Sequence, residues 1–277
     1  MYKVSVIIAF YNNTNFLKLV FAGLERQTEK NFEVIIADDG SNEESVRELK
    51  KMIEDSSFDV KHVWHKDKGW RKNIILNKSI LKSKSDQVIF MDADCVPHKE
   101  FISEHIKNRE PKTILTGRRA NISERVTFNL TPDRVKRGEL ENMKLIFFLE
   151  GLSRKTRHME KAFYIKSRYL RKQIQKKKST ILGCNFSMNK SDLFELNGFD
   201  ERYLAPACGE DSDIDMRARF LGLKFKSMNN MAIQYHLYHK ILPRGKENIE
   251  ILEENRKNEV IYTPYGLKKN PDINQSK

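Results

Sequence analysis

The sequence has few cysteines and no long apolar run. Its 277 residues include three cysteines, Cys95, Cys184 and Cys208, which are widely separated and odd in number. They form neither a disulfide framework nor a zinc-ligand spacing, so we expect reduced, mostly buried thiols. No apolar run reaches the roughly 18 residues of a membrane-spanning helix. The segment from Tyr2 to Phe10 enters a strand pattern without the features of a signal peptide, which favours a cytoplasmic protein.

Acidic residues are almost missing from one segment. Residues 154–178 hold eleven Lys or Arg and a single acid, Glu160, and so carry most of the net charge of +13. Apolar residues recur there at near-helical spacing: Ala162, Phe163, Ile165, Tyr169, Leu170 and Ile174. Such a basic helix suits an anionic membrane surface, and a solvated helix packed on the core is the open alternative. Because no nucleic-acid-binding motif accompanies it, we expect no nucleic-acid partner.

The first half of the chain alternates strand and helix patterns. Strands are expected at 2–9, 33–37, 60–64 and 88–91, with helices over about 14–24, 42–53 and 71–81. This alternation predicts βαβ units and a mostly parallel sheet, in which ligands bind beyond the carboxyl ends of the strands. A further strand is expected at 180–188, and the polar tail after Asn258 is expected to fray.

Two acidic clusters follow expected strands. Asp92 and Asp94 come after the apolar run Val88 to Met91, and Asp38-Asp39 follows the second strand. Carboxylates two residues apart on a strand leave the backbone on the same side, and buried carboxylates need a compensating cation. Hard oxygen ligands suit Mg²⁺ or Mn²⁺. A solvated Asp-rich turn explains either cluster alone, but two clusters meeting at one edge favour a metal and diphosphate site.

Taken together, the motifs of this sequence resemble those of one family, the inverting GT-A glycosyltransferases of family 2. The C-terminal region of the chain is similar to that of the β-1,4-galactosyltransferases and chondroitin polymerases. The matching motifs are Val4-Ser-Val-Ile-Ile-Ala-Phe-Tyr-Asn12, Gln27-Thr28, Asp38-Asp-Gly-Ser41, Asp92-Ala-Asp94, Gly183-Cys-Asn-Phe-Ser187, Asn197-Gly-Phe-Asp200, Gly209-Glu-Asp-Ser-Asp213 and His236-Leu-Tyr-His239. The resemblance implies a Rossmann-like α/β fold, GT-A in type, with a helical basic insertion. It implies a domain over 1–240, with a nucleotide-sugar half (1–119), the basic insertion (120–179) and an acceptor half (180–240), followed by a C-terminal helix and tail (241–277).

The resemblance also implies the donor site. Asp39 would accept an N–H of uracil, with Ala9 and Tyr11 beside it, although an Asx turn also explains Asp39. Arg71 resembles the arginine that approaches the diphosphate, which suits its forked donors, and a surface arginine is the alternative. Asp92 would face the ribose or a bridging water.

The metal ligands implied are Asp94 and a late histidine. His236 ends an expected strand, and His239, three residues on, is the competing candidate. A neutral imidazole suits Mn²⁺ better than Mg²⁺. The remaining histidines lack a comparable context: His62, His65, His98, His105 and His158.

Four acids open the helix expected after Gly209, which is more than capping needs: Glu210, Asp211, Asp213 and Asp215. The resemblance implies Asp211 as the base for the acceptor hydroxyl and Glu210 as a partner of the acceptor sugar. The galactosyltransferases carry Trp-Gly-Gly where this chain has Ala207-Cys208-Gly209, so neither sugar is transferred from them.

The expected activity is metal-dependent, inverting transfer from a UDP-sugar to a glycan or lipid-linked acceptor of a bacterial surface polysaccharide or lipopolysaccharide, on the inner face of the membrane. A sugar nucleotidyltransferase is one alternative, but the segment Ala9 to Asn13 lacks a Gly-rich phosphate loop. A non-catalytic docking module is the other.

Overall fold

The computed structural model describes residues 1–152, 158–206, 209–240 and 247–268. The strands are β1 Val4–Phe10, β2 Phe32–Asp38, β3 Asp59–Trp64, β4 Gln87–Asp92, β5 Cys95–Pro97, β6 Thr113–Thr116, β7 Arg118–Asn121, β8 Asn185–Asn189, β9 Lys224–Ser227 and β10 Ile233–His236. The first helices are α1 Thr14–Glu25, α2 Glu43–Glu54, α3 Lys72–Lys82 and α4 Phe101–Lys107. The middle of the chain adds α5 Glu124–Phe128, α6 Pro132–Lys136, α7 Glu139–Asn142, α8 Lys144–Leu152, the 3₁₀ turn η1 Met159–Ala162 and α9 Arg168–Gln175. The last helices are α10 Lys190–Glu195, α11 Glu210–Phe220 and α12 Glu247–Lys257.

Two sheets form the centre of the fold. The larger has the order β3-β2-β1-β4-β8-β6-β9, and β8 runs antiparallel to both of its neighbours while the other pairings are parallel. The smaller has the order β5-β10-β7. The predicted mostly parallel α/β sheet is therefore confirmed.

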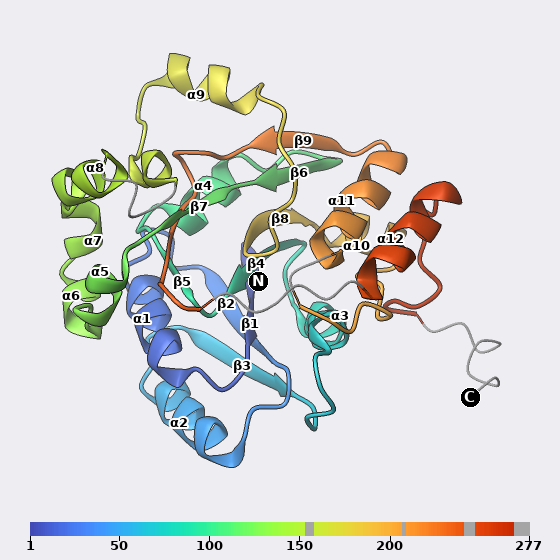
Figure 1. Ribbon diagram of the computed structural model, residues 1–277, viewed down its shortest axis with the longest axis horizontal. Helices are drawn as coiled ribbons and strands as arrows, with labels where there is room; N and C mark the ends of the chain where they lie inside the picture. The colour runs from blue at the N-terminus through green and yellow to red at the C-terminus, as the bar shows by residue number, and fades with distance from the viewer. Residues whose placement is uncertain (153–157, 207–208, 241–246, 269–277) are drawn as a thin grey trace.

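Helices cover both faces of the large sheet. In Figure 1, α1 and α2 lie on one side of it and α3, α10, α11 and α12 on the other. Alternate residues of β1 serve the two layers, because successive strand side chains point to opposite faces. Val6 and Ile8 join the apolar core beside α1, whereas Ile7 joins the core with Ile75 of α3.

The middle of the chain packs on this core, but its helices differ from the sequence pattern. Val126, Val135 and Phe147 belong to the same apolar cluster as β1. The near-helical pattern of 162–174 forms a helix only from Arg168, so that part of the prediction is wrong. The backbone before α9 bonds elsewhere, since Ile165 N–H donates to the carbonyl of Asn230 over 2.9 Å.

Two further expectations are corrected. The strand expected at 180–188 begins only at Asn185, because Gly183 and Cys184 form a turn in which Asn185 N–H donates to the Leu182 carbonyl. The chain from Asn258 to Lys268 is also held in place. Thr263, fully buried, donates to Asp200, and Leu267 N–H donates to the Asn197 carbonyl.

Candidate active site

The carboxyl ends of the central strands bring the predicted donor residues to one edge. Ala9 of β1 pairs in register with Ala37 of β2 and with Asp92 of β4. Tyr11 follows β1, and its hydroxyl donates to Asp67 over 3.0 Å. Since β8 is antiparallel, its first residue also lies at this edge, where Asn185 pairs with Met91. The turn before β8 therefore lies at the same edge of the sheet as the ends of β1, β2 and β4.

Asp39 is engaged by two neighbours at this edge. His65 Nε2 lies 2.7 Å from its Oδ1, and the backbone N–H of Arg71 donates to its Oδ2 over 2.8 Å. Burial raises the pKa of Asp39 and lowers the pKa of His65. A neutral His65 donating its Nε2 proton to Asp39 fits these directions. No role was predicted for His65 from the sequence, although this residue directly follows β3, the strand beside β2.

The side chains of Arg71 and Lys72 bind different partners at this edge. Arg71 stands at the N-cap of α3, and its side chain turns back to donate to the carbonyl of Lys66. Lys72 Nζ instead lies 2.8 Å from Asp92 Oδ1, with its side chain largely buried. Gly183 lies close to Lys72 Nζ and to Asp211, since a β-carbon at that glycine would stand 3.9 Å from Nζ and 3.8 Å from Asp211 Cβ. Lys72 thus binds the strand-end carboxylate and lies near Gly183, and it was not predicted as a site residue from the sequence.

Asp94 meets both candidate histidines. His236 Nε2 and His239 Nε2 lie 3.4 and 3.1 Å from Asp94 Oδ2, and 3.2 Å from each other. Leu237 N–H donates to the Asp94 carbonyl over 2.9 Å, which holds the turn after β10 against the segment after β4. Both histidines are therefore neighbours of the same carboxylate.

The thiol of Cys95 lies on the other side of this carboxylate. It donates to Asp94 Oδ1 over 3.0 Å. Burial raises the pKa of Cys95 far above its usual range, which keeps the sulfur protonated while it donates to Asp94. Burial opposes ionisation of Asp94, but hydrogen bonds from His236 and His239 outweigh it and hold the pKa of Asp94 well below its usual range. Asp94 is therefore a carboxylate with one oxygen turned to the thiol and one to the histidines.

The donor set fits a divalent ion. An octahedral ion with ligands at about 2.1 Å places neighbouring ligand atoms about 3.0 Å apart. The triangle formed by Asp94 Oδ2, His236 Nε2 and His239 Nε2 has edges of 3.1 to 3.4 Å, close to that spacing. Two imidazoles and one carboxylate on one face suit a first-row transition ion better than magnesium.

The acids of α11 divide into structural residues and one candidate base. Asp213 Oδ2 pairs with Arg217 over 2.7 Å, and Asp215 pairs with Arg219 and accepts from Ile181 N–H. Asp211 is only partly buried, and its Oδ2 accepts from Gly183 N–H over 3.3 Å, a long hydrogen bond. Glu210 is the first residue of α11, and its side chain lies outside the described residues. Among the described acidic side chains of α11, Asp211 is thus the one without an ion pair to a described residue, and it lies beside the turn that precedes β8.

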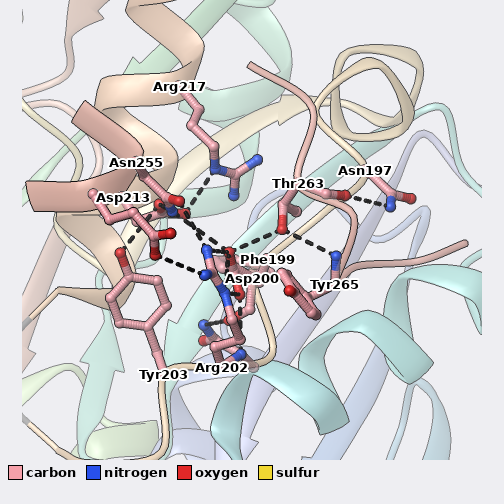
Figure 2. A network of polar contacts seen from close by, with 12 residues as sticks. Asn197, Phe199, Asp200, Arg202, Tyr203, Asp213, Arg217, Asn255, Thr263 and Tyr265 are labelled. Atoms are coloured by element: carbon pink, nitrogen blue, oxygen red, sulfur yellow. Dashed lines mark hydrogen bonds and ion pairs between the residues drawn. The ribbon is translucent and has the colours of Figure 1, made fainter. Parts of the chain in front are cut away.

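A buried polar network holds α11 in position (Figure 2). Asp213 accepts from Tyr203 and from Asn255 of α12, while the fully buried Arg217 also donates to the carbonyls of Leu196 and Gly198. The neighbouring Asp200 binds the guanidinium of Arg202 and the hydroxyl of Thr263. Such a network is stable only when its members are all satisfied, so it fixes the C-terminal segment against α11.

Close approach also requires glycine at the start of α11. Gly209 has φ +99°, and a β-carbon there would stand 2.6 Å from the Tyr203 ring.

Beside this helix, a cavity of about 430 Å³ reaches Asp211 and is bounded by Ile181, Arg219 and Arg256. The candidate base therefore borders a space that can hold part of a ligand.

The mostly parallel sheet between two helix layers, with acidic residues at its carboxyl edge, is a fold of the GT-A type. The structure superposes on the crystal structure of S. aureus TarS with a TM-score of 0.55 over 86% of this chain and 37% of that chain, at 16% identity. That likeness concerns the fold alone.

The sequence comparisons then give the family. The model described as glycosyl transferase family 2 matches residues 5–196, and the model described as N-terminal domain of galactosyltransferase matches residues 163–240. The chain belongs to glycosyltransferase family 2 and is a glycosyltransferase. The resemblance seen in its motifs is thereby confirmed.

Relatives include larger proteins. Chondroitin synthase of Escherichia coli is 25% identical over 88% of this chain and 35% of its own length, and that of Pasteurella multocida is 29% identical over 47% and 13%. Cholesterol galactosyltransferase of Borreliella burgdorferi is 33% identical over 34% of this chain and 25% of its own length. The chain thus spans about a third or less of each of these three proteins.

Proposed function

We propose that this glycosyltransferase moves a sugar from a nucleotide-sugar, in the first place a UDP-sugar, to a hydroxyl of a glycan acceptor, with inversion and with a divalent metal. The observation that carries the proposal is the convergence of three groups at one sheet edge. These are the triangle of Asp94, His236 and His239, the Lys72–Asp92 ion pair, and Asp211 beside Gly183. Family 2 membership supports both the donor class and the metal dependence.

Asp94, His236 and His239 would hold the metal, with manganese favoured by the two imidazoles. When bound, a divalent ion supplies positive charge that stabilises a departing diphosphate. Lys72 lies at the same edge and supplies a protein cation there. Asp39, with Ala9 and Tyr11, would receive the nucleoside, and its oxygen that accepts from Arg71 N–H remains able to accept a second donor.

Asp211 would act as the general base. The acceptor oxygen forms a bond to the anomeric carbon from the face opposite the nucleotide, while the bond from that carbon to the diphosphate oxygen breaks. The proton of the acceptor hydroxyl passes to Asp211, a contribution of about 10²–10⁴-fold for a positioned base. An α-linked donor then gives a β-linked product. Glu210 and the cavity beside Asp211 would take the acceptor sugar.

The acceptor is proposed from relatives. Chondroitin synthases act in the synthesis of a glycan, and the name of the Borreliella relative states a lipid acceptor. Together they support a growing glycan on a lipid carrier, as in a bacterial surface polysaccharide or lipopolysaccharide. Location on the cytoplasmic face stays a prediction, and none of the described helices is both long and apolar enough to cross a bilayer.

Two rival functions fit the site less well. A sugar nucleotidyltransferase needs a phosphate loop after β1, but Asn13 instead caps α1 by accepting from Phe16 N–H. A docking module has no use for the convergence of Asp94, His236 and Asp211. Hydrolysis of a panel of nucleotide-sugars, with and without Mn²⁺, tests the proposal. Nucleoside diphosphate release from one donor supports it, whereas pyrophosphate-dependent release of a nucleoside triphosphate would indicate the nucleotidyltransferase.

A further inference from the structure

Helix α8 carries two apolar faces. Phe147 is buried, and its ring lies 5.9 Å from that of Tyr235 in β10, which fixes the helix to the small sheet. Leu145, Phe148 and Leu149 occupy positions i, i+3 and i+4, and 69%, 55% and 55% of their surfaces are exposed. The neighbouring Ile146 is 38% exposed. Exposed apolar residues are usually scattered singly over a protein surface. A cluster of large apolar side chains in solvent is therefore typical of an interaction surface.

Helix α9 also combines a fixed face with an exposed one. Arg171 binds the buried Glu104 of α4 at 2.9 and 3.1 Å, and Gln175 donates to Asn108. This attachment leaves Tyr169 and Leu170 exposed. In Figure 1, α8 lies at the upper left and α9 at the top of the molecule.

The charges beside these helices indicate which kind of partner binds the exposed surface. The exposed cations in and around α9 are Lys166, Arg168, Lys172, Lys176, Lys177 and Lys178. Within the described part of the chain, no ion pair involves any of them. A second copy of this chain would bring the same cations against them, which is unfavourable, whereas anionic lipid headgroups are complementary.

We infer that α8 and α9 form a docking surface for an anionic lipid bilayer. Leu145, Phe148 and Leu149 enter the interface between headgroups and acyl chains, and the cations of α9 lie at the phosphates. Stable binding of a protein to a membrane surface usually needs two contributions. Here they are the burial of apolar side chains and the attraction between cations and anionic headgroups.

The surface also lies next to the candidate active site. Phe147 packs on Tyr235, which directly precedes His236, and Tyr238 N–H donates to Thr127 of α5 over 2.9 Å. Docking through α8 would therefore hold the metal-site edge near the bilayer, where a lipid-linked acceptor resides. This last step rests on the proposed function, but the docking itself does not.

Vesicle co-sedimentation tests the surface, with phosphatidylglycerol–phosphatidylcholine vesicles compared with pure phosphatidylcholine. The apolar variant combines Phe148→Ser with Leu149→Ser, and the charge variant combines Lys176→Gln, Lys177→Gln and Lys178→Gln. Matched controls are Leu81→Ser, 52% exposed on α3, and the pair Lys50→Gln and Lys51→Gln, exposed on α2.

We expect the wild type to bind the anionic vesicles. The apolar variant should lose about tenfold or more in partitioning. The charge variant should lose on the order of a hundredfold at low salt, and less at high salt. Both controls should bind like the wild type.

Several results would overturn the proposal. One is binding by both variants equal to that of the wild type, and another is an equal loss in the controls. A third is a dimer, seen by light scattering, that the apolar variant dissociates without any change in vesicle binding, because α8 would then join two copies. Donor hydrolysis is measured without vesicles for every variant, so that a failure of the proposed activity is separated from a failure of docking.

Discussion

The Nε2 atoms of His236 and His239 lie 3.2 Å apart, and both face Oδ2 of the same carboxylate, Asp94. Two imidazoles this close are unfavourable when both are protonated, since like charges repel. The hydrogen bond to Asp94 raises the pKa of His239. A divalent ion at this point would replace the protons and bind all three groups.

The first prediction concerns this pair. We expect His236→Gln and His239→Gln each to weaken Mn²⁺ binding, because each removes a direct ligand. Loss of a residue that only supports a ligand costs about 10–100-fold in metal affinity, so the loss of a ligand should be at least that large. Calorimetric titration of Mn²⁺ measures the effect, and the exposed His158→Gln is the matched control. Unchanged affinity in one of the two variants would mean that a single histidine completes the site.

The second prediction concerns Asp211. We expect Asp211→Asn to lower transfer by about 10²–10⁴-fold, because the amide cannot accept the acceptor proton, while donor affinity stays near the wild-type value. Transfer rates and calorimetry with the nucleoside diphosphate measure the two quantities. The same substitution at an exposed acid of α6, Asp133→Asn, is the control. Loss of diphosphate binding together with turnover would place Asp211 in the donor or metal site.

The third prediction separates Lys72 from Arg71. Lys72 lies 2.8 Å from Asp92, whereas the Arg71 side chain donates to a backbone carbonyl. We expect Lys72→Met to weaken nucleoside diphosphate binding by roughly tenfold or more, the value of a hydrogen bond to a charged group. Arg71→Gln should have a smaller effect, and Lys82→Met at the other end of α3 should have none. A larger loss of diphosphate binding in Arg71→Gln than in Lys72→Met would instead support Arg71 as the residue that binds the diphosphate, as the resemblance implies.

The fourth prediction concerns acid stability. Burial lowers the pKa of His105 to about 3, and its Nδ1 lies 2.8 Å from Ser187 Oγ. Between about pH 6.5 and 3, the unfolded chain binds a proton at this residue that the folded protein does not. The free energy of unfolding should therefore fall as the pH drops through this range, by up to about 1.4 kcal/mol per pH unit from this residue.

Urea unfolding at pH 7 and pH 5 measures that slope. His105→Gln, which cannot titrate, should be less stable at pH 7 but show a smaller loss between the two pH values. The exposed His158→Gln should keep the wild-type slope. An unchanged slope in His105→Gln would mean that other groups cause the acid sensitivity, since burial also lowers the pKa of His65 and of His98.

Much of the first half of the fold could be predicted because its signals are local. Asn13 and Asn42 cap α1 and α2 by accepting from backbone N–H groups three residues on, and β1, β2 and β4 are buried, largely apolar runs. The meeting of Asp39 and Asp92 followed from the rule that parallel strands end at one edge.

The parts that were wrong depend on distant contacts. The turn before Asn185 forms because Asp215, far along the chain, accepts from Ile181 N–H. Gly117 leaves room for the Asn185 side chain, which donates to the Ala232 carbonyl and so ties β8 to the small sheet. Neither pairing leaves a periodic signal in the sequence. The roles of Lys72 and His65 also arise from neighbours that the fold alone supplies.

The most direct test of the central claim is nucleotide-sugar hydrolysis by the wild type and by Asp94→Asn, each with and without Mn²⁺. The substitution removes a charge and a ligand at nearly constant volume, and circular dichroism checks that the fold is intact. We predict release of nucleoside diphosphate by the wild type with Mn²⁺, loss of that activity with a chelator, and none above background in Asp94→Asn. Full metal-dependent activity in a folded Asp94→Asn protein would contradict the account.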